Sequence, residues 1–547
     1  MIIDARRALP GSSFDAEVCV IGSGPAGATV AAELADRGLR VIVLEGGGTG
    51  RDRTADDTYR GVAGEGAHDP VEAVRQKRLG GTSAVWGGRC APLDDVDFSE
   101  REWIPDARWP IAHDELRRYY GRAQRHLDAG ECEYSAAASG FPDPSPEVTE
   151  TDALRWDDLW RWSPPTTFAP RMRTLAQTGR IRLFTHATVT RLDRDPVGGA
   201  ATEAVVVPRR GQEVRVRARE FVLAAGGLES TRILLASDGY GGSGLGAGIG
   251  NAHDQVGRHY MTHPVGEVGR LRLTPAGQAL GLGYAVTPEG VYARRMLSLA
   301  PSVQAEQGLG NLKAAVWFAD PKDPSHRDAL LSTFALTYWG MGRVRAGFKA
   351  AGTHAQYTST TGISRHLRNV VGDPRRVARF ARGWARPRLT GERHLPSFMP
   401  LDSSHCRLRF DAEQTPSATN RVTLDRERDA LGQCRLRIDY SVSASDRQSI
   451  ATSLTLIGKE LERTGLATVD LSDVERVGDL PMTDGTHQMG LLRMADSPRE
   501  GVVDARCRVH GTPNVHVASS AVFPSSGAVG PTLALVAMAC RTADGIS

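Results

Sequence analysis

The sequence predicts an α/β protein, α+β over the whole chain, and three observations lead to this class. Residues 17–45 contain an apolar run, a glycine turn, a helical pattern and a second apolar run, which is typical of a βαβ unit. Residues 220–235 repeat the strand, the glycine turn and the helix. Residues 266–479 contain alternating apolar runs, which favour an antiparallel sheet. We therefore expect a parallel and an antiparallel sheet in separate parts of the chain.

Composition limits the classes of protein to which the chain can belong. Its 547 residues suffice for about three to four domains. The 67 basic and 64 acidic residues give a net charge of +3, too small to attract nucleic acid or a membrane over the whole surface. Seven cysteines without a Cys-x-x-Cys pair argue against a disulfide scaffold and a zinc site. We therefore expect a cytoplasmic protein with no membrane span, no metal and no nucleic-acid partner.

The first βαβ pattern carries a glycine motif between its first strand and its helix. In such a motif the first glycine forms the turn, the second lets a pyrophosphate approach the backbone, and the third packs the helix against the strand. The N-terminus of the helix then offers free N–H groups to the phosphates. The sequence therefore predicts a dinucleotide site at Gly22, Ser23, Gly24, Pro25, Ala26 and Gly27.

An acidic residue ends the second strand of this unit. Glu45 follows the apolar run 39–44 and lies 18 residues beyond Gly27. A carboxylate at this position accepts a hydrogen bond from a ribose hydroxyl and repels a 2′-phosphate. NADP is thereby disfavoured, whereas NAD and FAD both stay compatible with the motif.

Three later segments extend the predicted cofactor site. Residues 79–88 form a glycine-dense loop suited to a flat ring or a phosphate, and residues 220–235 supply another strand end at the same ligand. Near the C-terminus, the strand 514–520 precedes a helix over 531–542 that starts with proline, a favoured first helical residue. The positive end of that helix would face a ring that becomes anionic on reduction. The candidate cofactor-binding residues in these parts are Gly80, Gly81, Thr82, Ser83, Trp86, Gly87, Gly88, Val189, Ala225, Gly226, Ser230, Ser520, Pro531 and Thr532.

Taken together, these motifs resemble the glucose-methanol-choline (GMC) oxidoreductase family, in particular its bacterial sugar-oxidising, pyranose oxidase-like branch. The likeness extends over most of the chain, and only residues 266–415 carry no matching motif. The matching parts are the N-terminal motif and residues 79–88, 103–127, 226–235, 250–264 and 485–541.

The resemblance implies an FAD enzyme in which hydride passes from an alcohol carbon to N5 of the flavin. It also implies a Rossmann-like FAD-binding domain assembled from both chain ends, beside a substrate domain with an antiparallel sheet covered by helices. His487 matches the active-site base of the family, and a neutral imidazole can accept the hydroxyl proton as the hydride leaves. We interpret His253, His259, His263, His510 and His516 as structural or surface residues.

Two positions depart from the family pattern. Members with covalently attached flavin carry a histidine where this chain has Val85, so we expect dissociable FAD. The second catalytic residue of the family, an Asn or His, falls on Gly530, which offers no side-chain donor to the developing alkoxide. A substrate group, a water or another residue could replace the donor, and Ser525, Ser526 and Thr532 are nearest in sequence. Otherwise the alcohol is reactive enough without such a donor, or the protein catalyses a different reaction on the flavin scaffold.

The expected domains are interleaved along the chain. The FAD-binding domain comprises residues 1–100, 180–265 and 480–547, and residues 101–179 form a helical cap or lid. Residues 266–479 form the substrate-binding domain, with a basic insertion over 343–393.

The basic insertion contains twelve Lys or Arg and two acids. Its apolar residues Val377, Phe380 and Trp384 recur at helical spacing, which predicts a basic amphipathic helix. A solvated helix packed on one face explains this pattern. Alternatives are binding of an anionic substrate, an acidic carrier domain or an anionic lipid surface, and self-association into a homo-oligomer.

The favoured function is FAD-dependent oxidation of a hydroxyl group of a sugar, glycoside or sugar-like natural product. The expected partners are a small-molecule alcohol and oxygen or a quinone as electron acceptor. One alternative keeps the flavin but makes the reaction redox-neutral, as a lyase or cyclase, because of Gly530. Another is a non-catalytic flavoprotein that serves as an assembly or carrier partner.

Overall fold

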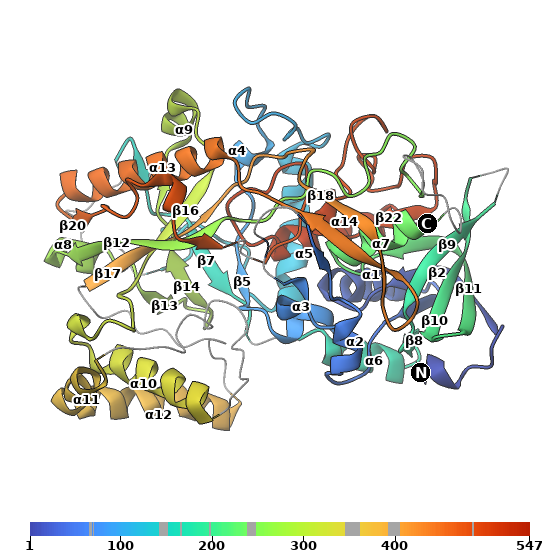
Figure 1. Cartoon of the computed structure of the whole chain (residues 1–547), viewed down its shortest axis with the longest axis horizontal. Coiled ribbons are helices and arrows are strands. Elements are labelled where there is room, and N and C mark those ends of the chain that lie inside the picture. The colour runs from blue at the N-terminus through green and yellow to red at the C-terminus, as the bar shows by residue number, and fades with distance from the viewer. Residues whose placement is uncertain are drawn as a thin grey trace.

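The computed structural model describes the chain except residues 65–67, 69, 142–150, 165–166, 196–198, 238–247, 345–361, 392–404 and 484–485. Its elements form two halves that lie side by side along the long axis (Figure 1). One half contains a largely parallel sheet and both chain termini. The other contains an antiparallel sheet and the helices that cover it.

The first half is built on an eight-stranded sheet in the order β1-β8-β3-β2-β11-β10-β9, with β22 beside β11. The neighbouring strands β1, β8, β3, β2 and β11 run parallel to one another, and β22 runs parallel to β11. The strand β10 is antiparallel to both of its neighbours, β11 and β9. Since β2 and β22 both pair with β11, the two chain ends meet in one sheet, and the predicted fold class is confirmed. The strands are β1 (Ile2–Asp4), β2 (Ser13–Ile21), β3 (Val41–Leu44), β8 (Ile181–Thr185), β9 (Val189–Arg194), β10 (Ala201–Arg209), β11 (Gln212–Leu223) and β22 (Val515–Val517).

Helices from distant parts of the chain pack together in this half. The helix α14 (Thr532–Asp544) contacts α1 (Pro25–Asp36) and α5 (His113–Leu127). The apolar residues of α1 and α14 are almost fully buried, which ties the C-terminal segment to the first βαβ unit. Arg122 of α5 adds ion pairs to Glu33 of α1 and Asp544 of α14, each at 2.6 Å.

The second half is built on a five-stranded antiparallel sheet, β16-β17-β12-β20, with β21 also paired to β12. All seven residues of β16 are buried, because the sheet is covered on both sides. The helix α13 (Ala444–Arg463) packs over one face. The strands are β12 (Val265–Leu273), β16 (Leu312–Phe318), β17 (His405–Ala412), β20 (Ala467–Asp470) and β21 (Met482–Thr483).

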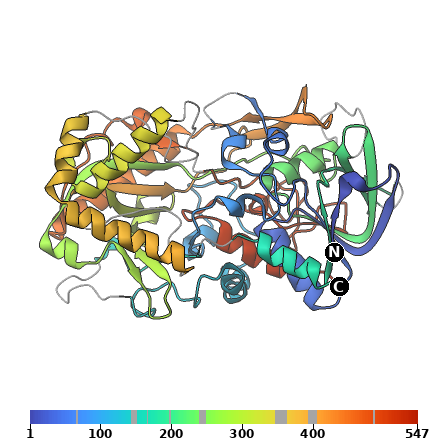
Figure 2. The same ribbon diagram turned by 90° about the horizontal axis from the view of Figure 1, so that it is seen from below.

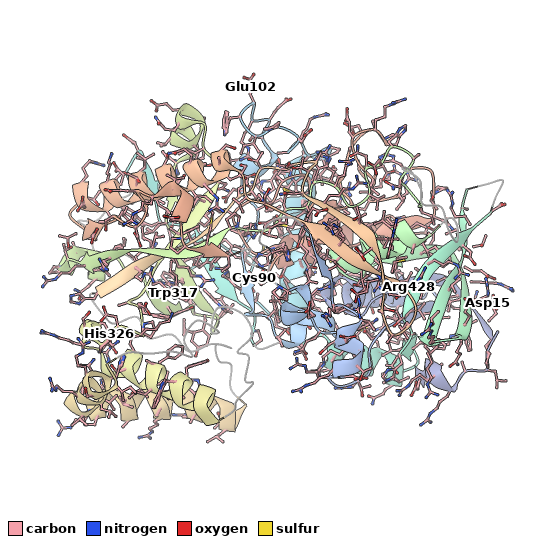
Figure 3. All side chains as sticks on the ribbon, in the orientation of Figure 1. Asp15, Cys90, Glu102, Trp317, His326 and Arg428 are labelled. Atoms are coloured by element: carbon pink, nitrogen blue, oxygen red, sulfur yellow. The ribbon has the colours of Figure 1, made fainter. Side chains whose placement is uncertain are left out.

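A smaller sheet, β13-β14-β7-β5, extends from beside the antiparallel sheet to β5 near the middle of the molecule (Figure 1). Figure 3 labels Cys90 of β5 near the middle of the molecule. Arg89 of β5 forms two hydrogen bonds with Asp411 of β17, at 2.8 and 2.7 Å, which fasten this sheet to the large one. The strands are β5 (Arg89–Cys90), β7 (Leu159–Trp162), β13 (Tyr284–Val286) and β14 (Tyr292–Arg295), so the predicted cap segment 101–179 also contributes a strand.

One part of the predicted antiparallel region lies elsewhere. The hairpin β18 (Arg421–Arg428) and β19 (Cys434–Asp439) forms as expected around a turn at Gly432. It pairs with β4 (Val62–Ala63) in a separate three-stranded sheet instead of joining the large one. The division of the chain into domains at the predicted boundaries stays a prediction.

Three helices lie against the antiparallel half: α10 (Ala329–Val344), α11 (Ile363–Gly372) and α12 (Pro374–Thr390), as Figures 1 and 2 show. The predicted basic helix is α12, although residues 345–361 and 392–393 of the insertion lie outside the described residues. Arg376 pairs with Asp328 at 2.9 Å and attaches α12 to the start of α10. Within the described parts of the chain, every helix is too short or too polar to cross a lipid bilayer.

Candidate active site

The glycine motif forms the predicted turn between β2 and α1. Gly22 has a φ of +105°, and a Cβ there would lie 2.4 Å from the carbonyl oxygen of Ala224. A Cβ on Gly27 would lie 2.1 Å from the carbonyl oxygen of Gly22, so only glycine fits either position. A Cβ on Gly24 would meet nothing within 4 Å. Open space therefore borders the N-terminus of α1, where Pro25 and Ala26 begin the helix and its free N–H groups suit a pyrophosphate.

The glycine-dense loop is fastened to this turn through Ser23. The backbone N–H of Gly80 donates to Oγ of Ser23 at 3.0 Å, and that hydroxyl donates to Glu45 at 2.5 Å. A Cβ on Gly81 would lie 3.1 Å from Cα of Gly24, so the two glycine segments are in close contact. Thr82 and Ser83 continue the loop as a 3₁₀ turn, and Ser83 donates to the carbonyl of Gly80 at 2.6 Å.

Glu45 lies at the end of β3, as predicted, and is buried. Its carboxylate also accepts from the backbone N–H of Gly47 at 2.7 Å. Burial raises the pKa of Glu45, whereas the hydrogen bonds from Ser23 and Gly47 lower it. A carboxylate oxygen can accept more than one hydrogen bond, so these contacts leave capacity for a ribose hydroxyl.

The candidates later in the chain reach the same region from two segments. Gly226 precedes α7 (Gly227–Ala236) with a φ of +83° and open space where a Cβ would be. Ser230 of α7 has a buried hydroxyl with no partner among the described residues. Oγ of Ser520 donates to the carbonyl of Gln488 at 2.8 Å, which joins the C-terminal segment to the neighbour of His487.

The remaining candidates lie at the borders of this region. Ala225 follows β11, Val189 is a buried residue at the start of β9, and Pro531 and Thr532 begin α14 within one residue of the prediction. Gly88 lies next to β5, where a Cβ would meet the carbonyl of Ser163 at 2.8 Å. The other two loop residues are Trp86, which packs on the main core, and Gly87, which borders open space.

His487 is paired with a second histidine that sequence reasoning did not assign to the site. Nδ1 of His487 lies 2.7 Å from Nδ1 of His263, and Nε2 of His263 lies 2.9 Å from the carbonyl oxygen of Ser526. A carbonyl only accepts, so Nε2 of His263 must carry its proton. Nδ1 of neutral His263 is then an acceptor, and Nδ1 of His487 must donate to it. Neutral His487 therefore holds its proton on Nδ1 and exposes a lone pair on Nε2, the form that a general base requires.

The electrostatic surroundings keep both imidazoles neutral. Burial lowers the pKa of His263 below 6.5. Burial also lowers the pKa of His487 well below 6.5, and the positive charge of Arg89 adds to this effect, whereas Asp411 opposes it. His487 is therefore competent to accept a proton over the neutral pH range.

Gly530 lies beside this imidazole, as the resemblance implied. A Cβ on Gly530 would lie 3.9 Å from Nε2 of His487 and 3.7 Å from the carbonyl oxygen of Arg89. A Cβ at Gly530 would therefore be in ordinary van der Waals contact with the His487 ring, so the glycine leaves the volume of a methyl group unfilled beside its lone pair. Ser525 does not fill the missing donor role, because it accepts from Trp109 and donates to the carbonyl of Asp97. Ser526 is likewise fully buried and bonded to the backbone of Gln414.

Sequence reasoning also missed the ion pair behind the histidines. Arg89 and Asp411 come from strands of different sheets, and Asp411 is almost fully buried. The Arg89 guanidinium helps to hold the pKa of Asp411 at about 2 against the effect of burial. A sequence signal existed for His263, because it lies in the segment 250–264 that resembles the family. None existed for Asp411, which falls in the part of the chain without motifs.

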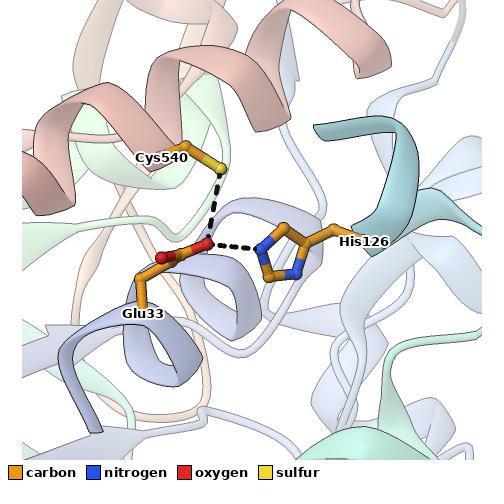
Figure 4. Close-up of side chains that lie close together, drawn as sticks. All are labelled: Glu33, His126 and Cys540. Atoms are coloured by element: carbon orange, nitrogen blue, oxygen red, sulfur yellow. Dashed lines mark hydrogen bonds and ion pairs between the residues drawn. The ribbon is translucent and has the colours of Figure 1, made fainter. Parts of the chain in front are cut away.

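The side chains of Glu33, His126 and Cys540 lie together as in a metal site (Figure 4), but arginines already contact two of the three. The three ligand atoms lie within 4.8 Å of one another. Glu33, however, also binds Arg122 at 2.6 Å, and the other ring nitrogen of His126 contacts Arg171 at 2.6 Å. Burial raises the pKa of the Cys540 thiol to about 12, so the thiolate that a metal requires is disfavoured. We interpret the cluster as an ion-pair network that joins α1, α5 and α14.

The residues present fit a bound dinucleotide, and the segments that would hold it lead toward His487. Open space borders Gly24 and Gly226, the hydroxyl of Ser230 has no partner among the described residues, and Ser520 joins the C-terminal segment to Gln488, next to His487. The family model for "FAD dependent oxidoreductase" matches residues 17–400, more than two thirds of the chain. The chain belongs to the FAD-dependent oxidoreductases. A second model, for "GMC oxidoreductase", matches residues 416–539 of this oxidoreductase, so the predicted family and the FAD cofactor are confirmed.

Curated relatives and solved structures agree with this assignment. The oxidoreductase is 25% identical to paromamine 6′-oxidase of Streptomyces fradiae, over 97% of its own length and 91% of the relative. It is 24% identical to 2-methyl-1,2-propanediol dehydrogenase of Mycolicibacterium austroafricanum, over 98% and 96%. It shares its fold with a variant of Aspergillus oryzae formate oxidase (TM-score 0.53, 17% identity, 98% and 99% covered). The same holds for an FAD-dependent oxidoreductase from Chaetomium thermophilum (TM-score 0.53, 14% identity, 97% and 98% covered).

Proposed function

We propose that this oxidoreductase oxidises a hydroxyl group of a sugar, glycoside or sugar-like natural product to a carbonyl, with His487 as the base. The relatives support an alcohol as substrate, and the name of paromamine 6′-oxidase supports a sugar-like one. The observation that carries the proposal is the lone pair on Nε2 of His487, beside which Gly530 has no side chain. These relatives are oxidases and dehydrogenases, which does not favour a redox-neutral or non-catalytic role.

FAD, when bound, supplies the acceptor for the hydride that leaves the carbinol carbon. Nε2 of His487 takes the hydroxyl proton, so the alcohol loses one proton and one hydride and becomes a carbonyl. The resulting imidazolium of His487 still donates its Nδ1 proton to Nδ1 of His263. Because the donor is now charged, this hydrogen bond is strengthened. Asp411 favours the protonated form electrostatically, which helps to stabilise the charge that develops on His487.

The residues around the flavin site also support non-covalent attachment. Val85 occupies the loop position at which covalently flavinylated members have a histidine, and an aliphatic side chain cannot form that bond. Cytoplasmic location belongs to the proposal as well. It is supported by the seven cysteines, none of which forms a disulfide.

The basic helix α12 is a candidate binding surface for a partner of this oxidoreductase. Its outward face carries arginines at spacings of three and four residues, so like charges lie close together along the helix. This arrangement supports an anionic partner, such as a carrier domain, but homo-oligomerisation through the apolar residues is equally compatible. The arginines are Arg375, Arg379, Arg382 and Arg386.

Anaerobic mixing of the oxidised holoenzyme with a panel of sugars and glycosides tests the proposed function. We expect at least one alcohol to bleach the flavin absorption, and His487→Ala to slow this step by about 10² to 10⁴. His253→Ala, at an exposed histidine, is the matched control and should react like the wild type. Bleaching that is equally fast in His487→Ala would refute the proposed base, and a panel without any active alcohol would refute the substrate class.

A further inference from the structure

The helices α11 and α12, here called the outer helix pair, concentrate positive charge on one side of the molecule. They pack mainly against α10 at the margin of the antiparallel half (Figures 1 and 2). Residues 363–390 contain eight arginines and one acid, Asp373. Asp373 accepts from the backbone N–H of Arg376 at 3.1 Å and so caps α12, and the side chain of Arg376 pairs with Asp328. Two carboxylates against eight guanidiniums leave the outer helix pair strongly positive.

Four of these arginines form a stripe along α12. They follow one another at spacings of four, three and four residues, so they share one face of the helix, and all four are exposed. A rise of 1.5 Å per residue makes the stripe about 16 Å long. Like charges at these spacings destabilise a helix, and α12 has no acidic residue to separate them. The stripe is therefore unfavourable in water and favourable against an anionic surface. Its members are Arg375, Arg379, Arg382 and Arg386.

Exposed apolar side chains accompany the arginines. Leu367 and Val371 lie four residues apart on α11 and are 52% and 77% exposed. Leu389 of α12 is 86% exposed and follows Arg386 by three residues, so it lies beside the stripe. With Trp384, the outer helix pair holds four of the ten large apolar side chains that are exposed in the described parts of the chain. This concentration exceeds the ordinary scatter of single apolar residues over a protein surface.

The placement of the apolar residues favours a lipid surface as the occupant. The helix α12 alone also fits an acidic protein or a second copy of the chain. A protein interface, however, gathers its apolar residues in one core within a polar rim. Here Val371 precedes α12 and Leu389 lies near its end, so the arginine stripe and about 25 Å of helix separate them. A bilayer requires no matching shape, and it can receive separate aliphatic side chains between guanidiniums that bind headgroup phosphates.

We propose that the outer helix pair docks this oxidoreductase on an anionic lipid surface. The arginines of the stripe bind the phosphates of the headgroups, and Leu367, Val371 and Leu389 enter the outer part of the acyl layer. The attachment is peripheral and reversible, because it consists of surface charge and a few side chains. This proposal concerns where the enzyme works and does not depend on the proposed reaction.

Flotation of the holoenzyme with lipid vesicles tests the proposal. Vesicles of equal parts phosphatidylglycerol and phosphatidylcholine should carry the protein upward in a density gradient, whereas vesicles of phosphatidylcholine alone should not. Binding should fall about tenfold or more between about 50 and about 500 mM NaCl, because salt screens the attraction of exposed charges. Equal behaviour with both kinds of vesicle, including no binding to either, would overturn the proposal.

Paired arginine variants assign the binding to the stripe. Arg379→Gln combined with Arg382→Gln should weaken binding to the anionic vesicles about 20-fold, since each arginine near a charged membrane contributes a factor of about five. The matched control removes two exposed arginines of α5, Arg118→Gln combined with Arg125→Gln, and should bind like the wild type. Both variants should keep their FAD and their melting temperature. If the two variants bind the vesicles equally well, the assignment to the outer helix pair is wrong.

Serine variants separate lipid from the other occupants. Val371→Ser and Leu389→Ser should each weaken vesicle binding about tenfold, because an apolar side chain no longer enters the bilayer. Val286→Ser, at an exposed valine of β13, is the control and should bind like the wild type. If both serine variants bind normally and polyglutamate binds the holoenzyme as tightly as the vesicles do, an acidic protein replaces lipid as the partner. A dimer in sedimentation velocity that dissociates in Val371→Ser would assign the face to a second copy of the chain. Either result would overturn the proposal.

Discussion

The contact between His263 and His487 yields a sharp prediction about catalysis. Replacement of His263 by leucine removes the acceptor that holds the proton of His487 on Nδ1. His487 then distributes its proton between both ring nitrogens, and only the form with a free Nε2 can accept the hydroxyl proton. A buried hydrogen bond of this kind favours one tautomer by about 1 to 2 kcal/mol. The ratio of the two tautomers should therefore shift by about 5- to 30-fold, and the rate should fall by a similar factor, because the imidazolium that forms on His487 loses the same hydrogen bond.

Stopped-flow measurement of flavin reduction under anaerobic conditions gives this rate directly. His263→Asn is the matched control, because its side-chain oxygen can still accept from Nδ1 of His487. We expect this variant to retain most of the activity, within about threefold of the wild type. The concentration of substrate at half-saturation should change little in either variant, since His263 acts through His487 and does not contact the substrate.

A structural role alone would give a different pattern. Leucine also leaves the carbonyl of Ser526 unpaired, so both variants must first be shown to bind FAD and to melt near the wild-type temperature. If the leucine and asparagine variants lose the same activity, or if the leucine variant reacts within twofold of the wild type, the assignment of the tautomer is refuted.

Three further predictions concern the base, the cofactor and the core. Because the pKa of His487 is well below 6.5, the rate of flavin reduction should be constant from pH 8 to 6.5 and fall only at lower pH, where the imidazole takes a proton. A midpoint of the acid limb at or above 6.5, measured by stopped flow, would contradict this. Acid precipitation should release all FAD into the supernatant, because Val85 cannot hold it covalently. A yellow pellet would contradict non-covalent attachment. Arg101→Met breaks an almost fully buried pair with Glu413 and should cost about 3 to 5 kcal/mol in chemical unfolding. Arg108→Met breaks an exposed pair and should cost less than about 1 kcal/mol; equal losses would be inconsistent with the burial.

The local parts of the fold could be predicted from the sequence. The turn at Gly22, the start of α1 and the position of Glu45 follow from residues within one βαβ unit. The start of α14 follows from Pro531, and the helix α12 from its periodic apolar residues. In each case neighbours in sequence determine the backbone conformation, so the pattern is sufficient.

The site itself depends on contacts between distant segments. His263 and His487 are 224 residues apart, and their hydrogen bond exists because the start of β12 and the segment after β21 lie next to each other. Arg89 and Asp411 are 322 residues apart and come from strands of two different sheets. Spacing in one chain does not report such pairings, which is why the resemblance pointed to His487 and Gly530 but not to the ion pair of Arg89 and Asp411.

A crystal structure of the oxidoreductase with FAD bound tests the central claim most directly. We predict that the phosphates lie at the N-terminus of α1 near Gly24 and that the reactive edge of the flavin ring faces Nε2 of His487. The gap between them should be wide enough for one carbinol group, with reacting atoms about 3 to 3.5 Å apart when it is filled. A flavin ring whose reactive nitrogen is remote from His487, or FAD bound away from the glycine motif, would contradict the account.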